Sequence, residues 1–377
     1  MKKSAKKAAT TRRLSDVTRN LSAVNGIRSR ARKSSSAPVR LADVARYAGV
    51  STASVSRAFN EPELVSIELR DRVTRAAHVL NWVPNGAAKA LASSQSRTIG
   101  ALIPSLGHQN FGVLVEALQR ELAKPNYTLV LGCAESRATD LRLQLARKMV
   151  ERGIDWLVLV GEAQPDALFE LLKAQRIPYL ITYTSGTNSG NTCIGYDNYR
   201  ATARITRHLL DLGHRRFAMV AESPEYNDRI QQRIAGVKDT LAQAGLGIKP
   251  RQFVEVDTPR RLAGGRGALG RLLADSSDRP TAIICSNDYI ATGVMIEAAS
   301  RNISVPGEFS VTGFDDLDMS AHLVPGLTTV RVPARQLGEE IAHYVTRFLA
   351  TGSAPLPGAL DAEFVVREST GPPPPER

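Results

Sequence analysis

The sequence predicts two parts of different fold class: a small all-α headpiece with a helix-turn-helix, followed by a larger α/β domain. Three observations predict this division. Residues 39–84 show helical periodicity and cap residues, whereas from residue 99 short apolar runs alternate with amphipathic stretches of helix length. In addition, the net positive charge is concentrated in the first hundred residues.

The charge distribution indicates which end of the chain binds a polyanion. The formal net charge is +12, and residues 1–38 hold eleven Lys or Arg against one acidic residue, Asp16. Residues 99–377 hold 30 basic and 31 acidic residues, so the basicity belongs to the N-terminal part. Two interpretations of the leader, residues 1–38, stay open: a solvated, disordered tail without a role, and an arm that attracts phosphates.

Several classes of protein are not expected. No run of about 18 apolar residues is present, so nothing is expected to span a membrane. The N-terminal MKKSAKKAATTRR lacks the apolar stretch of a secretory signal, which makes the cytoplasm the expected location. Cys133, Cys193 and Cys285 form neither a C-x-x-C pair nor a metal-ligand spacing. They are expected as small buried residues, and neither a metal nor a cofactor is predicted.

The first helix of the headpiece is predicted from an apolar stripe. Leu41, Val44, Ala45 and Ala48 fall at i, i+3, i+4 and i+7, which places them on one helix face. Gly49 then ends the helix. A second short helix directly after this glycine makes the pair a helix-turn-helix.

Two more helices complete the headpiece. Ser51 is a ready N-cap for a helix that runs through Asn60, with Val55 and Phe59 facing inward. Ser66 caps the third helix, because the apolar residues after it repeat at helical spacing. These residues are Leu69, Val73, Ala76, Ala77 and Leu80. The three helices are expected to share one small core, which spans residues 39–84.

Residues 85–98 are predicted to form a hinge helix and a linker. Pro84 disfavours helical geometry in the residue before it, so the third helix ends upstream. Asn85 then caps a short alanine-rich segment up to Ser93 that contains Leu91. A helix this short is marginal in water because nucleation is costly, so it needs a partner to be stable.

The α/β domain is predicted from residue 99 to residue 367. Near residues 195–197 the series of strands and helices starts again, which divides the domain into two similar subdomains. Ligands of open α/β sheets bind at the carboxyl ends of strands, here in a cleft between the subdomains. The tail, residues 368–377, is proline-rich and expected to be extended or disordered. The predicted strands are TIGALIP, YTLVLGC, IDWLVLVG, IPYLIT, RFAMVAE, TAIICSND and FSVTGFDD.

The headpiece residues also carry a family resemblance. The run DVARYAGVSTASVSRAFN, followed by VSIELRDRV and NWVPNGAAKALAS, closely resembles the headpiece of the LacI/GalR family of bacterial transcription regulators. The similarity continues to about Arg367. It implies a bilobed, periplasmic-binding-protein-like effector domain, in which the late segment from Thr328 to Thr351 returns to the first lobe.

The resemblance also implies a function and partners. It implies a cytoplasmic, sequence-specific DNA-binding regulator, by default a repressor, that binds a pseudo-palindromic operator in double-stranded DNA as a homodimer. No heptad run follows Arg367, so no tetramerisation helix is expected. The implied effector is a small sugar or sugar acid. The run at Tyr196, Asp197 and Asn198 is similar to gluconate-type regulators, which favours a sugar acid.

The resemblance assigns DNA contacts residue by residue. Thr52, Ala53 and Arg57 match the base-reading positions, and Arg57 suits a bidentate contact to guanine. Leu91 matches a residue that wedges into the minor groove. The alternatives are ordinary helix-surface chemistry for the polar residues and a core position for the leucine. The predicted DNA-binding residues are Ser51, Thr52, Ala53, Ser54, Ser56, Arg57, Asn85, Ala88 and Leu91.

The resemblance likewise places an effector site in the cleft. Arg233 matches the family's effector-binding arginine, and the pairs Asn287-Asp288 and Asp315-Asp316 follow strands where a sugar cleft requires polar groups. The alternatives are helix caps and surface residues, and Asn287 in particular suits a cap. The predicted effector-binding residues are His108, Phe111, Tyr183, Arg233, Asn287 and Asp315.

Two departures from the family pattern lie at the rim of the cleft. Gly107-His108-Gln109-Asn110 stands where much of the family has Thr-Asn-Pro-Phe, and Tyr183 stands where an aspartate often touches the sugar. The departures leave the identity of the sugar open. A second interpretation of His108 is an ordinary surface histidine of a loop.

Two competing functions agree less well with the sequence. A solute-binding protein of a sugar transport system would share the two lobes, but it needs a signal peptide and has no use for a headpiece. An enzyme is suggested only by Gly265 to Gly270, which satisfies G-x-G-x-x-G. No strand is expected closely before this motif, so it is interpreted as part of a helix with small residues for packing. No catalytic constellation is present, and no enzyme activity is predicted.

Overall fold

The computed structural model describes residues 38–86, 95–186, 190–257, 261–274 and 279–375. The chain divides into two compact units, Met1–Ser94 and Gln95–Arg377. The predicted fold class is confirmed, because the first unit contains only helices among its described residues and the second contains two parallel sheets. Each unit is described by itself.

The headpiece helices lie where the sequence predicts them. Gly49 ends the first helix in the left-handed conformation, with φ of 65°. The Ser51 hydroxyl oxygen accepts a hydrogen bond of 3.0 Å from the backbone N–H of Ser54, and Ser66 caps the last helix in the same way. Val44, Val55 and Val73, one from each helix, are fully buried in the shared core. The elements are α2 (Leu41–Ala48), α3 (Thr52–Asn60), the 3-10 turn η1 (Pro62–Leu64) and α4 (Ile67–Val79).

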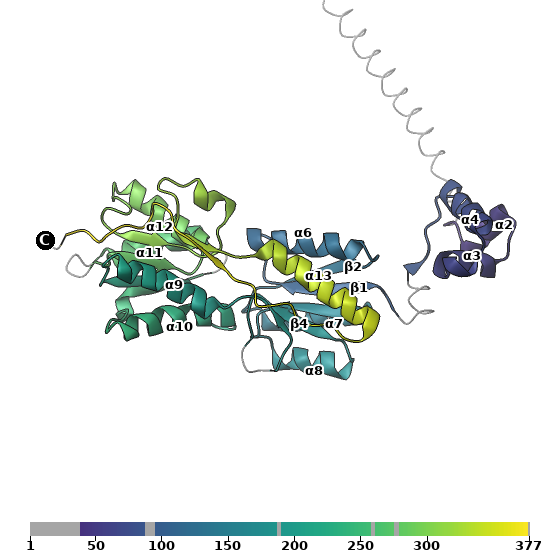
Figure 1. Ribbon diagram of the computed structural model, residues 1–377, viewed down its shortest axis with the longest axis horizontal. Coiled ribbons are helices and arrows are strands. Elements are labelled where there is room, and N and C mark those ends of the chain that lie inside the picture. The colour runs from purple at the N-terminus through teal and green to yellow at the C-terminus, as the bar shows by residue number, and fades with distance from the viewer. Residues whose placement is uncertain (1–37, 87–94, 187–189, 258–260, 275–278, 376–377) are drawn as a thin grey trace, which may run out of the picture. The chain divides into compact units, whose positions relative to one another are not determined.

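The first lobe of the second unit is a five-stranded parallel sheet in the order β2-β1-β3-β4-β5. Along β3, Trp156, Val158 and Val160 face the core under α6 and α13, whereas Leu157 and Leu159 face α7 and α8 (Figure 1). Helices therefore cover both faces, which is why the strands read as continuous apolar runs. The elements are β1 (Thr98–Ile103), α6 (Gln109–Ala123), β2 (Thr128–Cys133), α7 (Thr139–Glu151), β3 (Trp156–Val160), α8 (Asp166–Ala174), β4 (Tyr179–Thr182) and β5 (Cys193–Ile194).

The second lobe repeats this plan with a four-stranded parallel sheet in the order β7-β6-β8-β9. Phe217 and Met219 of β6 face α9 and α10, and Ala218 and Val220 face α11 and α12. The alternation again follows from the two-residue period of a strand. The elements are α9 (Asn198–Asp211), β6 (Phe217–Glu222), α10 (Asp228–Gln243), the 3-10 turn η2 (Pro250–Gln252), β7 (Phe253–Val256), α11 (Arg261–Leu272), β8 (Ala282–Cys285), α12 (Asp288–Ser300), β9 (Ser310–Thr312) and the 3-10 turn η5 (Asp318–Ala321).

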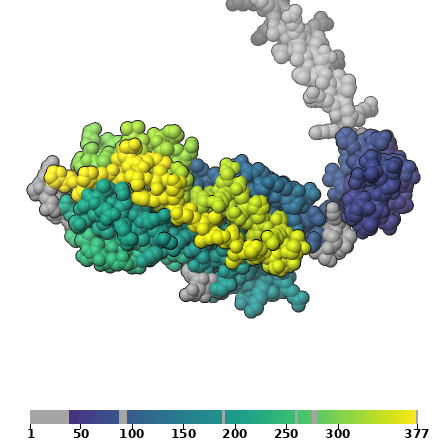
Figure 2. Space-filling view, in the orientation of Figure 1, coloured from purple at the N-terminus to yellow at the C-terminus, as the bar shows by residue number. Residues whose placement is uncertain are grey.

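Late segments of the chain connect the two lobes. Strand β10 (Thr329–Arg331) leads into α13 (Ala334–Thr351), which packs on α6 of the first lobe, and β11 (Glu363–Val365) then returns to pair with β10. Gly338 allows the close approach of α13, because a Cβ there would lie 2.6 Å from the carbonyl oxygen of Leu114. The C-terminal segment, yellow in Figure 2, extends over the surface of both lobes.

The C-terminal segment stays packed on the second lobe beyond Arg367. Ser369 is fully buried and donates a hydrogen bond of 2.6 Å to the carbonyl oxygen of Val311. The ring Nε2 of the buried His214 lies 2.9 Å from the carbonyl oxygen of Gly371. These contacts anchor the residues that precede the proline run.

The cysteine prediction holds for one residue of three. Cys285 is buried in β8, and Cys193 is half-buried in β5. Cys133 is exposed, because it ends β2, the edge strand of the first sheet. Edge strands lack a neighbour on one side, so burial there is incomplete.

The G-x-G-x-x-G motif lies within α11, as predicted, although strand β7 does precede the helix, contrary to the expectation from sequence. The motif is in the second turn of the helix and not in the turn between strand and helix, where a phosphate site requires it. A Cβ on Gly265 would lie 2.2 Å from the carbonyl oxygen of Ile290, and one on Gly293 would lie 2.2 Å from that of Leu262. The glycines therefore let α11 and α12 pack closely.

Gly265→Ala is expected to destabilise the protein by about 1 to 3 kcal/mol, because the new methyl group meets backbone that cannot move aside. Gly267→Ala is the matched control, since a Cβ at Gly267 meets nothing within 4 Å. It should be neutral or stabilising by up to about 1 kcal/mol, as alanine favours a helix. Urea unfolding followed by circular dichroism measures both. Equal stability of the two variants would contradict the packing role.

Candidate functional site

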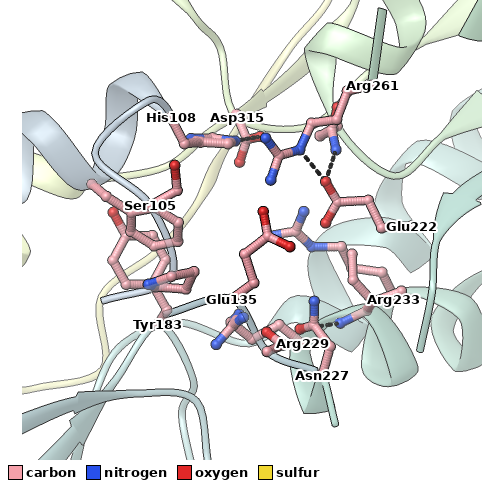
Figure 3. Close-up of a pocket in the computed structure, with 15 residues that line it drawn as sticks. Ser105, His108, Glu135, Tyr183, Glu222, Asn227, Arg229, Arg233, Arg261 and Asp315 are labelled. Atoms are coloured by element: carbon pink, nitrogen blue, oxygen red, sulfur yellow. Dashed lines mark hydrogen bonds and ion pairs between the residues drawn. The ribbon is translucent and has the colours of Figure 1, made fainter. Parts of the chain in front are cut away.

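The two lobes enclose a cleft of about 600 Å³, including its open mouth. The carboxyl ends of parallel strands from both sheets meet there, which is where ligands of open α/β sheets bind. The structure brings all six residues that the sequence assigned to the effector site into this one cleft (Figure 3). They are His108, Phe111, Tyr183, Arg233, Asn287 and Asp315.

Four charged residues line the same cleft and were missed from the sequence: Glu135, Glu222, Arg229 and Arg261. Glu222 is the last residue of β6, and Glu135 follows shortly after β2. The rule that polar residues after a strand face the cleft would have found both. Arg229 lies one turn before Arg233 on α10, a spacing that also puts it on the same face. No sequence pattern distinguishes Arg261.

A chain of hydrogen bonds crosses the floor of the cleft from one lobe to the other. The Tyr183 hydroxyl donates to the carbonyl oxygen of Asn110 (2.9 Å), and the Asn110 side-chain amide donates to the carbonyl oxygen of Asp315 (3.1 Å). The Asn198 amide donates to the carbonyl oxygen of Tyr183 (2.9 Å). Burial raises the pKa of Tyr183 well above its ordinary value, which keeps the hydroxyl a donor.

Arg233 continues this chain on the second lobe. Its Nε donates to Asn198 Oδ1 (2.9 Å) and its Nη1 to the carbonyl oxygen of Ser286 (2.7 Å). Its Nη2 lies 3.4 Å from the Tyr196 hydroxyl, and the guanidinium carbon lies 3.5 Å from the centre of the Phe314 ring. These contacts use three of the five guanidinium N–H groups, so two stay available to the cleft.

His108 and Asp315 meet across the cleft from opposite lobes. His108 Nε2 lies 3.1 Å from Asp315 Oδ2, and both residues are buried, so His108 is not a surface histidine. The contact is not a hydrogen bond, so Asp315 Oδ2 has no hydrogen-bond partner among the described residues, and His108 Nδ1 has none either. The carboxylate oxygen can accept from a ligand, whereas the ring nitrogen can donate or accept according to its tautomer.

Backbone strain positions Asp315. Asp315 and Asp316 both have positive φ, 127° and 49°, a conformation that L-residues rarely adopt. The Asp316 carboxylate holds the turn through ion pairs of 2.7 Å with Arg331 and 2.7 Å with Arg367. The strain is thus offset by contacts behind the cleft, and the result is a carboxylate turned into it.

Asn287 caps a helix, as one of its two interpretations predicts, and it also lines the cleft. Its Oδ1 accepts from the backbone N–H of Ile290 (2.9 Å), which caps α12, and its Nδ2 donates to Glu222 Oε1 (3.0 Å). Glu222 in turn pairs with Arg261. The cap therefore fixes an amide at the wall of the cleft.

Asp288 does not line the cleft, although the sequence grouped it with the cleft residues. It is fully buried and accepts hydrogen bonds from the hydroxyls of Ser320 (2.6 Å) and Thr329 (2.6 Å) and from the backbone N–H of Leu317 (2.9 Å). The first residue of α12 points away from the cleft, toward the loop that leads to β10. Asp288 thereby anchors the segment after Asp315.

The outer face of α3 presents the predicted base-reading residues. Thr52 and Ala53 are exposed, and the Arg57 side chain is 57% exposed, with its Nε 3.9 Å from Glu61 Oε2. Such a helix face suits the major groove of DNA. Arg57 is free to exchange its weak ion pair for a base.

The predicted phosphate-binding serines have contacts of their own. Ser51 caps α3, and the hydroxyls of Ser51 and Ser54 lie 2.9 Å apart. The Ser56 hydroxyl accepts from the Asn60 amide (3.2 Å). Asn85 is exposed, whereas Ala88 and Leu91 lie outside the described residues.

Comparison with known proteins identifies the family. A family model described as bacterial regulatory proteins, lacI family, matches residues 40–85, and one described as a periplasmic binding protein-like domain matches residues 206–370. The HTH-type transcriptional regulator GntR of Pseudomonas aeruginosa is 31% identical over 332 residues, which cover 88% of this chain and 95% of that protein. This chain belongs to the LacI/GalR family.

Other LacI/GalR proteins are similar over most of their length. The HTH-type transcriptional regulator GalR of Escherichia coli is 31% identical, over 80% of this chain and 86% of GalR. The crystal structure of the lac repressor dimer bound to operator and the anti-inducer ONPF is 27% identical, covers 89% of this chain and 99% of that one, and superposes with a TM-score of 0.77.

Membership of the LacI/GalR family fixes the function of each part. The protein is a sequence-specific DNA-binding transcription regulator, with a helix-turn-helix headpiece and a bilobed effector domain. The relatives named above are regulators, and nothing among them supports a solute-binding protein of a transport system. In the described part of the chain, no helix has both the length and the apolar character needed to cross a membrane.

The buried Asp288 gives a pH dependence with a definite sign. Burial, followed by the charge of Asp315, raises the pKa of Asp288 to about 6. The folded protein therefore binds this proton more tightly than the unfolded chain does. The contribution of Asp288 to the free energy of unfolding falls as the pH rises from about 4 to about 6, and is constant above that.

The Asp288→Asn variant lacks this titration. We expect the free energy of unfolding of the wild type, relative to the variant, to fall between pH 4 and 6 and then to level off. Urea unfolding of both proteins at several pH values measures the difference. A difference that does not change with pH would show that Asp288 ionises in the fold as it does in water.

Proposed function

We propose that this LacI/GalR protein is a cytoplasmic repressor that binds a pseudo-palindromic operator as a homodimer and is released by a small effector in the interlobe cleft. The observation that supports this proposal is the cleft, because its polar residues come from both lobes. A ligand that contacts both lobes distinguishes one lobe angle from another. Differential affinity for two conformations is what an effector requires to shift an equilibrium.

The proposed effector is a small hydroxylated molecule, a sugar or a sugar acid. His108, Asn287 and Asp315 supply donors and acceptors for vicinal hydroxyls. Phe111 and Tyr183 supply apolar surface beside them, with ring centres 4.9 Å apart. Effector roles for these residues and for Arg233 agree with their common place in the cleft.

For DNA, we propose that Thr52, Ala53 and Arg57 read bases in the major groove. Ser51, Ser54 and Ser56 are proposed to hold phosphates, which positions the helix without adding sequence information. The symmetry of a homodimer requires a symmetric site. Asn85, Ala88 and Leu91 of the hinge segment stay proposed contacts in the minor groove.

Arg57→Ala tests the DNA-reading face. The operator is first selected from a random pool of double-stranded DNA with the wild-type protein. The variant should bind this operator more weakly by about 1 to 3 kcal/mol and lose its preference at one position of each half-site. Fluorescence anisotropy with substituted operators measures both effects. Arg75→Ala is the control, because Arg75 is an exposed arginine of α4 outside the reading face.

A uniform loss of affinity on all DNA sequences would instead show that Arg57 is a phosphate contact.

A thermal-shift screen of sugars, sugar acids and sugar phosphates tests the cleft, because a ligand that binds the folded state raises its melting temperature. The compounds that bind should also lower the affinity for the selected operator. Binding without any change in operator affinity would contradict the regulatory role of the cleft.

A further inference from the structure

Among the described residues, the cleft holds two buried arginines whose guanidinium groups form no ion pair with a carboxylate. Arg229 and Arg233 lie four residues apart on α10, are 7% and 6% exposed, and both line the cleft. Among the described residues, Arg233 contacts only neutral acceptors and a ring, and no residue accepts a hydrogen bond from the Arg229 guanidinium. By contrast, the third arginine of the cleft, Arg261, is paired with Glu222.

This arrangement is unfavourable in an empty cleft. Buried charges in proteins are normally paired, because desolvation is costly. Like charges four residues apart on one helix face repel each other. Arg229 is also the second residue of α10, where the helix dipole is positive and disfavours a cation. All three effects are relieved by an anion placed between the two guanidinium groups.

Asp228, the residue before Arg229, binds the first lobe and makes no ion pair with the Arg229 guanidinium. Asp228 accepts hydrogen bonds from the backbone N–H groups of Glu162 (3.0 Å) and Ala163 (3.4 Å) of the first lobe. Arg142, which is buried nearby, has its pKa lowered to about 10 by burial and then by the charge of Arg229, whereas the charge of Asp228 raises it. Asp228 therefore offsets the positive charge of Arg229 only in part, without an ion pair to its guanidinium.

The backbone of the first lobe makes room for Arg229. Gly161, which follows β3, has φ of 79°, and a Cβ there would lie 2.3 Å from Nη1 of Arg229. Only glycine fits this position, so the guanidinium lies against the first lobe although its helix belongs to the second. Arg229 therefore lies where the two lobes meet.

We propose that the effector is a hydroxylated anion whose carboxylate or phosphate is held by Arg229 together with Arg233. The proposal rests on the function proposed above and names the chemical class of the ligand. Two guanidinium groups match the geometry of an oxyanion, which accepts paired hydrogen bonds. His108, Asn287 and Asp315 then hold the hydroxyls, and Arg229 selects for the charge.

Glu135 has an opposing effect. It is an exposed residue whose carboxylate also points into the cleft in Figure 3, on the side of Arg229 and Arg233. No arginine of the described chain lies within ion-pair distance of it. The carboxylate offsets part of the positive charge at longer range, and it competes with an anionic ligand. Its removal should strengthen the binding of an anion.

The test compares anionic ligands with neutral ligands of the same carbon chain. Five- and six-carbon aldonates are compared with the corresponding alditols, and hexose 6-phosphates with the parent hexoses, by calorimetric titration into the full-length protein. An aldonate differs from its alditol by a carboxylate in place of a CH₂OH group. We expect at least one aldonate or hexose 6-phosphate to bind more tightly than any alditol, by a factor of about ten or more. The comparison of aldonates with hexose 6-phosphates shows whether the site prefers a carboxylate or a phosphate.

Arg229→Gln should remove this preference, and Arg229→Lys should retain part of it, because lysine keeps the charge without the paired hydrogen bonds. Glu135→Gln should tighten binding of the anion and leave that of the alditol unchanged. Without ligand, Arg229→Gln should melt no lower than the wild type, because it removes a repulsion. A merely structural arginine would lower the melting temperature instead.

The possible outcomes distinguish failure of the anion assignment from failure of the proposed function. If alditols or neutral sugars bind as tightly as the anions, or if Arg229→Gln and Arg229→Lys both keep the wild-type preference, the assignment of an anion is overturned. The cleft as a regulatory site then stands. If no compound of any class binds, or if none changes the affinity for the selected operator, the proposed function fails together with the inference.

Discussion

The buried chain of hydrogen bonds across the cleft floor is the constraint on which the rest of the effector domain depends. From Arg233 it runs through Asn198, Tyr183 and Asn110 to the backbone of Asp315, and so crosses between the lobes twice. Buried donors and acceptors must be satisfied, so the lobes cannot separate here without loss of the two hydrogen bonds that join them. The floor therefore ties the two lobes together below the walls of the cleft.

The walls carry the groups that the fold leaves unsatisfied. Asp315 is turned inward at the cost of two residues with positive φ, and the buried Arg229 has no ion pair at its guanidinium among the described residues. The strained backbone is held in place by surrounding contacts, for example the two arginines that pair with Asp316. A ligand that relieves these costs in one lobe arrangement more than in another supplies the differential affinity that regulation requires.

Much of this fold could be predicted from the sequence, and the exceptions have physical reasons. Helices α2 to α4 carry caps and apolar stripes, and the long strands are continuous apolar runs, so both were found. Strands β5, β7, β10 and β11 have two to four residues each, and no continuous apolar run in the sequence predicts them. Asp288 was misassigned because a strand end does not say which way each side chain points. Arg229 was missed because the lack of an ion pair at a buried arginine can be recognised only in the three-dimensional structure.

The proposed regulation requires occupancy of the cleft and binding of operator DNA to be coupled. Thermodynamic linkage requires the coupling to be reciprocal. The most direct measurement is the Kd of the tightest-binding aldonate or hexose phosphate for the full-length protein, with and without saturating operator DNA. We expect weaker binding on DNA, by the same factor by which the ligand weakens operator binding. An identical Kd in both states would contradict the coupling.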